Sequence, residues 1–159
     1  MAPQTFSPED WKPITSEAVK ATIRTEASPY GPAARIDFDF TKQGGFVLAE
    51  IARKIELDPN YEFTFMMKAK TPVNDFEFKL MDEKGDSVWW VKKQAYRWPT
   101  EWTRMSIRKS HFRYGWGPKR ELFDTISAFQ LGIAAFDGGK GTVWIAQPEI
   151  RPAPVPKPF

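Results

Sequence analysis

The segment HFRYGWGPKR, residues 111–120, combines the single histidine of the chain with aromatic and basic side chains. A serine–histidine–acid triad would need His111 as its base, but the chain lacks a glycine–serine–glycine elbow. One histidine is too few for a histidine-based metal site, and the absence of cysteine excludes thiolate sites, disulfides and a cysteine nucleophile. We therefore interpret the segment as a strand end and a rim loop. Phe112 would pack inward, and Tyr114 and Trp116 would be presented to a ligand.

Paired carboxylates are the remaining catalytic option. Asp37 and Asp39, and likewise Asp75 and Glu77, occupy alternate positions, as in glycan-cleaving enzymes that use two carboxylates. Period-two alternation also produces such pairs on ordinary solvated strand faces, and we favour that interpretation. The pattern Glu-x-Asp-x-x-Glu of retaining glycanases is absent. The glycines of DGGKG predict a hairpin turn and not a phosphate-binding loop.

The composition is that of one domain with unusually many aromatic residues. The 159 residues carry a net charge of +3, spread along the chain, which does not indicate a nucleic-acid partner. No apolar run is long enough to cross a membrane, and the N-terminus lacks a signal-peptide pattern. Aromatic residues make up 15% of the chain and include seven tryptophans, so we expect some rings at the surface, where they favour binding.

The elements that must position these side chains are strands. Apolar residues alternate with polar ones in ARIDFDF, YEFTFMMKAK and DFEFKLMD, and this period of two predicts half-buried strands. Such stretches lie at 34–40, 61–70, 75–82, 127–136 and 141–150, with further strands expected within 19–27, 44–57, 86–93 and 103–112. The alternation predicts one core that contains Phe38, Phe65, Phe78, Leu131 and Ile133.

Turn signals separate these stretches, among them SPYGP, KQGG, EKGD and DGGKG. About nine strands at regular spacing predict an all-β domain, a single antiparallel β-sandwich of jelly-roll type, over residues 1–150. The tail RPAPVPKPF, residues 151–159, alternates proline, so we expect a stiff linker that does not pair in a sheet.

Three segments carry a resemblance to a known family. YRWPTEWTRMSIRKSHFRYGWGP, ISAFQLGIAAFDGGKGTVWI and the earlier PYGPAARIDFDF resemble galactose-binding-like jelly-roll modules, over roughly Trp11–Ile150. This is the fold of many non-catalytic carbohydrate-binding modules and discoidin-like domains. The resemblance implies a module of a secreted bacterial polysaccharide-active enzyme, with an appended catalytic domain, and an extracellular location for which this sequence would have lost its signal.

The resemblance also implies a structural calcium, with a carboxylate of the closing strand among its ligands. Where the family usually has two aspartates, GTVWIAQPEI has Ala146 and Gln147, and Glu149 alone remains. Calcium requires hard oxygen ligands, preferably charged. We therefore expect neither a functional dependence on calcium nor any other cofactor.

Each ring can be assigned to packing or to binding. Adjacent residues of a strand face opposite sides, so we place Trp89 inside and Trp90 outside. By the same parity Trp144 faces outward, whereas we assign Trp11 and Trp102 to packing. Four rings lie in or beside turn-rich segments, where they could form either a ligand site or a cluster that closes one end of the sandwich: Tyr96, Trp98, Tyr114 and Trp116. Arg113 and Arg104 would be polar partners for sugar hydroxyls.

These observations predict a non-catalytic carbohydrate-binding module that recognises a polysaccharide, such as a β-glucan, by ring stacking and hydrogen bonding. The predicted carbohydrate-binding residues are Trp90, Tyr96, Trp98, Arg113, Tyr114 and Trp116. Two alternatives remain open: a protein-interaction or architectural domain of a secreted protein, and a small glycan-cleaving enzyme. A groove with exposed rings favours the first function, a flat apolar patch the second, and carboxylates facing across a cleft the third.

Overall fold

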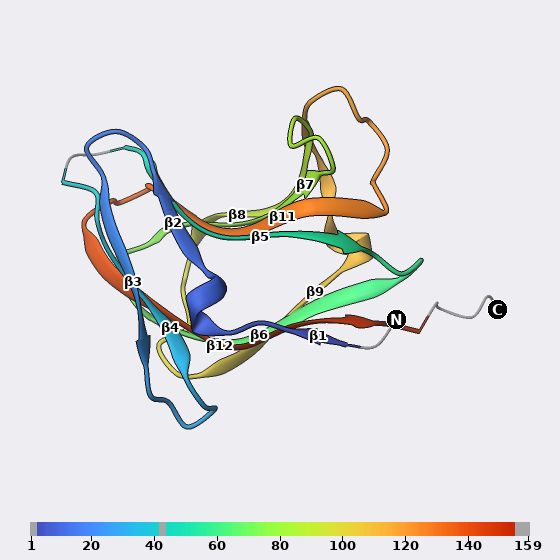
Figure 1. The fold of residues 1–159 in the computed structure, drawn as a ribbon. Helices are drawn as coiled ribbons and strands as arrows, with labels where there is room; N and C mark the ends of the chain where they lie inside the picture. Colours follow the sequence, from blue (N-terminus) through green and yellow to red (C-terminus); the bar gives the residue numbers. More distant parts are fainter. Residues whose placement is uncertain (1–2, 42–43, 155–159) are drawn as a thin grey trace.

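The computed structural model describes residues 3–41 and 44–154 and is a sandwich of two antiparallel sheets (Figure 1). Among these residues each sheet has six strands. The lower sheet of Figure 1 has the order β3-β4-β12-β6-β9, with β1 also paired to β12, and the upper sheet has the order β10-β8-β7-β11-β5-β2. This architecture confirms the predicted all-β jelly-roll sandwich. None of the helices in the described ranges is long and apolar enough to cross a membrane.

The lower sheet consists of β1 (Gln4–Thr5), β3 (Lys20–Glu26), β4 (Ala33–Asp39), β6 (Tyr61–Lys70), β9 (Thr103–Arg108) and β12 (Lys140–Pro152). The upper sheet consists of β2 (Lys12–Thr15), β5 (Phe46–Glu56), β7 (Asn74–Asp82), β8 (Val88–Tyr96), β10 (Arg113–Trp116) and β11 (Thr125–Ala134). Two 3-10 turns, η1 (Pro8–Asp10) and η2 (Lys109–His111), complete the elements.

The core lies between the two sheets and is rich in phenylalanine. Every second residue of the central strands points inward and is buried, and the five residues predicted to share a core do so: Phe38, Phe65, Phe78, Leu131 and Ile133. The ring of Phe78 lies 5.0 Å from that of Phe63 and 6.0 Å from that of Phe129, centroid to centroid. Aromatic contacts at these distances add to the stabilisation from burial alone.

The C-terminal boundary is a correction to the sequence prediction. Strand β12 continues past residue 150, because Arg151 and Pro152 pair with Glu62 and Tyr61. The amide of Ala153 then donates to the Asn60 carbonyl. Proline can occupy this position because the pairing does not require an N–H from it. Residues 155–159 of the predicted linker, and residues 42–43 of the predicted KQGG turn, lie outside the described part.

The first and last described strands lie side by side. Gln4 pairs with Ile150 and Thr5 with Glu149, in antiparallel register. Figure 1 accordingly shows β1 beside the end of β12 in the lower sheet.

Candidate functional site

A cleft of about 640 Å³ lies over the outer face of the upper sheet. Figure 1 shows this face between two groups of raised loops: residues 82–87 and 117–124 on one side, and the loop between β2 and β3 with the residues just before β5 on the other. The residues that line the cleft are Gly45, Phe46, Leu48, Glu77, Lys79, Met81, Gly85, Val88, Trp90, Trp116, Gln130 and Ala134. They come from β5, β7, β8, β10, β11 and the adjoining loops, so the cleft crosses the strands of the sheet.

One wall of the cleft contains two tryptophans. Trp90 points outward from β8, as its parity predicts, and Trp116 ends the edge strand β10. The two rings meet edge to face with their centroids 5.2 Å apart. Trp116 remains 45% exposed, which makes it one of the most accessible large apolar side chains among the described residues. A ring held at one edge and open on its face can stack on a pyranose.

Close packing between two loops fixes the position of Trp116. Gly117 has φ = +103°, and a Cβ there would lie 2.3 Å from the Asp86 carbonyl oxygen. The Lys119 amide donates to Ser87 Oγ at 2.9 Å, and the Tyr114 hydroxyl donates to the Gly117 carbonyl at 2.7 Å. Glycine is needed here because another residue would push the loop away from the 82–87 hairpin.

The floor of the cleft is charged and largely buried. Lys79 Nζ lies 3.2 Å from Glu77 Oε1, and Lys92 Nζ lies 3.5 Å from Glu77 Oε2 and 3.9 Å from Asp75 Oδ2. Asp75 is 7% exposed and Glu77 5%. The expectation that this pair belongs to a solvated face is therefore wrong: both carboxylates are buried, and Glu77 lines the cleft. Burial of these charges is tolerated because lysines compensate them.

The lysines of the floor also approach the aromatic wall. Lys79 Nζ lies 5.8 Å from the centroid of Trp90 and 5.6 Å from that of Trp116, and Lys92 Nζ lies 5.2 Å from Trp90. A cation this close to an indole is attracted by the negative face of the ring. These contacts link the charged floor to the wall.

A second polar pair lies farther across the floor. Gln130 Nε2 donates to Glu50 Oε2 at 2.6 Å, from neighbouring positions of β11 and β5. Phe46 and Leu48 extend outward from β5 next to this pair. The floor thus offers carboxylate, ammonium and amide groups between an aromatic wall and an apolar wall, which suits a ligand with hydroxyl groups and apolar C–H faces.

Of the predicted binding residues, only Trp90 and Trp116 line this cleft. Trp98 is 7% exposed, packs on Phe76, and donates from Nε1 to the Asn74 carbonyl at 3.0 Å. Tyr96 lies beside it, with ring centroids 5.3 Å apart, and packs against the core. The expectation that Trp98 is exposed is wrong, since a backbone carbonyl inside the sandwich satisfies its N–H.

Tyr114 and Arg113 also lie away from the cleft lining. Tyr114 packs edge to face on Trp89, which faces the core as predicted. Arg113 is exposed, and its guanidinium donates to the carbonyls of Ser110 and Phe112. Of the four rings in the turn-rich segments, three therefore pack within the structure, and Trp116 alone lines the cleft.

His111 and the other carboxylate pair take structural positions at the surface. His111 Nδ1 accepts a hydrogen bond from the Arg108 amide at 3.0 Å, which closes the turn η2. Asp37 pairs with Arg35, and Asp39 with Lys140, on the outer face of the lower sheet. These contacts agree with the interpretation of Asp37 and Asp39 as part of a solvated strand face.

The closing strand β12 has a bulge at the positions where the family resemblance implies calcium ligands. Ala146 is fully buried, Gln147 has φ = +51°, and the pairing of β12 with β6 shifts between Ala146 and Glu149. Within residues 3–41 and 44–154, no three histidine, aspartate or glutamate side chains gather in a group that could hold a metal ion.

Sequence reasoning missed most of the polar floor. Glu77 and Lys79 occupy outward positions of β7, and polar outward residues ordinarily indicate solvent. A signal lies in the neighbouring strand β11, where the small outward-facing residues Gly132 and Ala134 pair with Glu77 and Asp75 of β7. Those small residues leave the space in which the cleft forms.

Several solved structures of carbohydrate-binding modules share this fold. The chain superposes on the family 11 module of the cellulosomal cellulase Lic26A-Cel5E of Clostridium thermocellum with a TM-score of 0.71 and 13% identity, over 96% of this chain and 95% of that chain. A family 11 module from the same organism, in complex with a β-1,3-1,4-mixed-linked tetrasaccharide, gives 0.70 and 13%, over 95% and 96%. The family 30 module of its cellulase Cel9D-Cel44B gives 0.67 and 14%, over 96% and 98%.

These likenesses establish that the chain shares the β-sandwich fold of those modules. No family model matches the sequence, and no curated protein matches it.

Proposed function

We propose that the protein is a non-catalytic carbohydrate-binding module that holds a β-glucan chain in the cleft of the upper sheet. The observation that carries the proposal is the pairing of exposed Trp116 and Trp90 with a floor of fixed polar groups. Sugar C–H faces would stack on the indoles, and hydroxyls would bond to Glu77, Lys79 and Gln130. The mixed-linked tetrasaccharide bound by a module of the same fold supports a glucan as the ligand.

The arrangement of carboxylates favours binding over hydrolysis. Two-carboxylate hydrolysis needs acids on opposite sides of a glycosidic bond. Asp75 and Glu77 instead come from one strand and share Lys92 as their ion-pair partner, while Glu50 accepts from Gln130. We propose that a catalytic domain lies elsewhere in a secreted parent protein, as the cellulases named for the related modules suggest.

The test is a titration with soluble β-1,3-1,4-glucan, with affinity and melting temperature measured together. Trp116→Ala is expected to weaken binding roughly ten- to a hundredfold, because central aromatic residues dominate small interfaces. The melting temperature should change little, since nearly half of the side chain is exposed.

Phe136→Ala is the matched control. Phe136 is also an exposed aromatic residue, and it is not among the residues that line the cleft. The control should bind glucan like the unmodified protein. Equal losses in both variants, or no binding by the unmodified protein, would contradict the proposal.

A further inference from the structure

The outer face of the lower sheet carries a second group of rings and charges, far from the cleft. One register across adjacent strands places Arg24, Arg35, Trp144 and Lys68 in a row. Trp102, just before β9, extends this row, and Tyr30 packs edge to face on Trp102 with centroids 5.6 Å apart. Trp102 was predicted to pack in the structure, whereas its side chain is half-buried on the outer face of the sheet. Trp144 faces outward, as predicted.

Lys68 is the central group of this face. Its ammonium lies 4.6 Å from the centroid of Trp144 and 5.5 Å from that of Trp102. None of the ion pairs found among the described residues involves Lys68, Lys70 or Arg104. Lys68 is therefore a partly buried cation between two indoles, and within the described part of the chain no carboxylate pairs with it. Such a cation attracts an anionic ligand more strongly than a fully solvated lysine does.

Hydrogen bonds hold the neighbouring ring in place. Trp144 Nε1 donates to Glu26 Oε2 at 2.5 Å, and Arg35 donates to Glu26 Oε1 at 3.0 Å. The bond from Trp144, followed by that from Arg35, lowers the pKa of Glu26, so this carboxylate stays charged at neutral pH. The orientation of Trp144 is thus fixed before any ligand arrives.

Cations outnumber carboxylates on this face, although the sequence spreads its basic residues along the chain. The outward positions of four neighbouring registers carry the cations Lys20, Arg24, Arg35, Lys68, Lys70, Arg104 and Lys140, against the acids Glu26, Asp37 and Asp39. The lysines of the cleft floor, by contrast, are paired with carboxylates. The two faces therefore suit ligands of different charge.

We infer that the outer face of the lower sheet is a second binding surface, for an acidic polysaccharide. Carboxylate or sulfate groups of the polymer would pair with Lys68, Lys70 and Arg104, while its sugar rings pack on Trp102 and Tyr30. The interspersed acids argue against nucleic acid, because duplex DNA presents one charge per roughly 1.7 Å and would be repelled by them. A polymer whose charges are spaced one sugar apart can place these charges between the carboxylates of this face.

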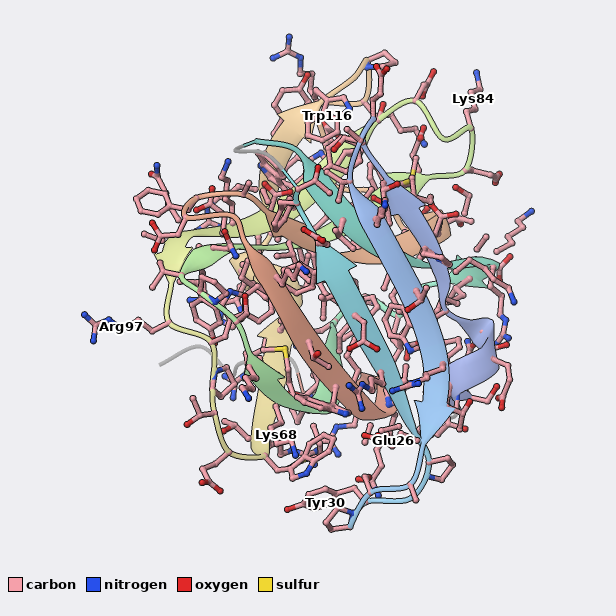
Figure 2. The ribbon with its side chains drawn as sticks, turned by 90° about the vertical axis from the view of Figure 1, so that its left-hand side faces the viewer. Glu26, Tyr30, Lys68, Lys84, Arg97 and Trp116 are labelled. Carbon is pink, nitrogen blue, oxygen red and sulfur yellow. The ribbon has the colours of Figure 1, made fainter. Side chains whose placement is uncertain are left out.

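The two sites are separable in experiment. Figure 2 shows Glu26, Tyr30 and Lys68 at one end of the molecule, and Trp116 and Lys84 at the other. Binding should be measured for polygalacturonate, for its fully methyl-esterified form, and for dextran sulfate, each at low and at moderate salt. Polygalacturonate tests carboxylate recognition, dextran sulfate tests sulfate recognition, and the neutral ester tests whether charge is required.

Lys68→Gln is expected to weaken binding of at least one acidic polymer roughly tenfold, because a charge-assisted contact is lost. Lys84→Gln, which removes an exposed lysine at the hairpin tip, should leave binding unchanged. Lys70→Gln serves as a second variant if Lys68→Gln lowers the melting temperature. Trp116→Ala should retain acidic-polymer binding, which separates this inference from the proposed glucan site.

Equal losses in Lys68→Gln and Lys84→Gln would overturn the inference, because they would indicate attraction by net charge alone. Equal binding of polygalacturonate and its methyl ester would overturn it as well. So would a Lys68-dependent interaction with duplex DNA or anionic vesicles in the absence of binding to both acidic polysaccharides.

Discussion

At the scale of single residues, a tryptophan can line the cleft or pack in the core, depending on its surroundings in the fold. Trp116 and Trp98 both follow turn-rich sequence, yet one ring borders the cleft and the other is buried against Phe76. The alternation of β8 predicted Trp90 correctly, because parity is a local property of a strand. The position of Trp98 depends on a bond to the Asn74 carbonyl, from another strand, which no local pattern contains.

Trp98→Ala is therefore expected to act on stability. Removing a buried indole leaves a cavity and an unpaired carbonyl, and such changes cost about 3–5 kcal/mol of the free energy of unfolding. Denaturant unfolding followed by tryptophan fluorescence measures this loss. The protein that remains folded should bind glucan normally, and a variant with full stability but weak binding would contradict the assignment.

Glu77→Gln tests the charged floor. The substitution leaves the ammonium of Lys79, whose side chain is 11% exposed, without its carboxylate. We expect a loss of about 1–3 kcal/mol in the free energy of unfolding, as for other buried groups deprived of a partner. Glu83→Gln is the control, because Glu83 and Lys54 form an exposed pair that should contribute little. Both losses are measured by urea unfolding. Similar losses in the two variants would show that the Glu77–Lys79 pair contributes no more to stability than an exposed pair.

At the scale of elements, the rim hairpin between β7 and β8 depends on one carboxylate. Asp82 Oδ1 accepts hydrogen bonds from the amides of Asp86 and Ser87, both at 3.0 Å. Burial of Asp82 raises its pKa, but these amides outweigh burial and hold the pKa below the ordinary value of 3.8. The folded state thus favours the ionised form of the side chain.

The sign of the resulting pH dependence follows from this lowered pKa. The stabilisation is complete above the unfolded-state pKa and is lost as pH falls through the lower folded-state value. We expect the melting temperature of the unmodified protein to fall more steeply from pH 5 to pH 2 than that of Asp82→Asn, which has no charge to lose. Parallel curves from thermal scans across this range would contradict the role of the carboxylate.

The long strands could be predicted from the sequence, and the short ones could not. Period-two alternation over seven to thirteen residues is a strong signal, and β4, β6, β7, β11 and β12 lie where it predicts them. The edge strands β1, β2 and β10 have two to four residues, too few to show a period. The segment HFRYGWGPKR is predicted to be a strand end and a rim loop, and its residues RYGW form β10, which pairs with β8 through a register shift.

At the scale of the whole molecule, the cleft could be predicted only in part. Its lining comes from residues 45 to 134, brought together by the order of strands in the upper sheet. The sequence indicates which rings face outward but not which strands become neighbours. Glu77, on β7, and Gln130, on β11, therefore remained unrecognised as parts of one site, although each strand was expected.

The fold is expected to be independent of calcium. Ala146 and Gln147 replace the acids expected from the family resemblance, and a metal bound only to the folded state would raise the melting temperature by mass action. Thermal scans with a chelator, and again with excess calcium, should therefore coincide. A drop of several degrees with the chelator, restored by calcium alone, would reveal a site built from other oxygen ligands.

The pairing of β1 with the end of β12 also determines how the domain responds to mechanical load. Because β1 and the end of β12 are antiparallel neighbours, a force that separates the termini pulls this pair apart from its open end. The hydrogen bonds of the pair would then break one after another, in an unzipping geometry, and not all together in shear. Since β1 has only two residues, tension between partners attached at both ends would detach it early and would then load β2, the edge strand of the upper sheet.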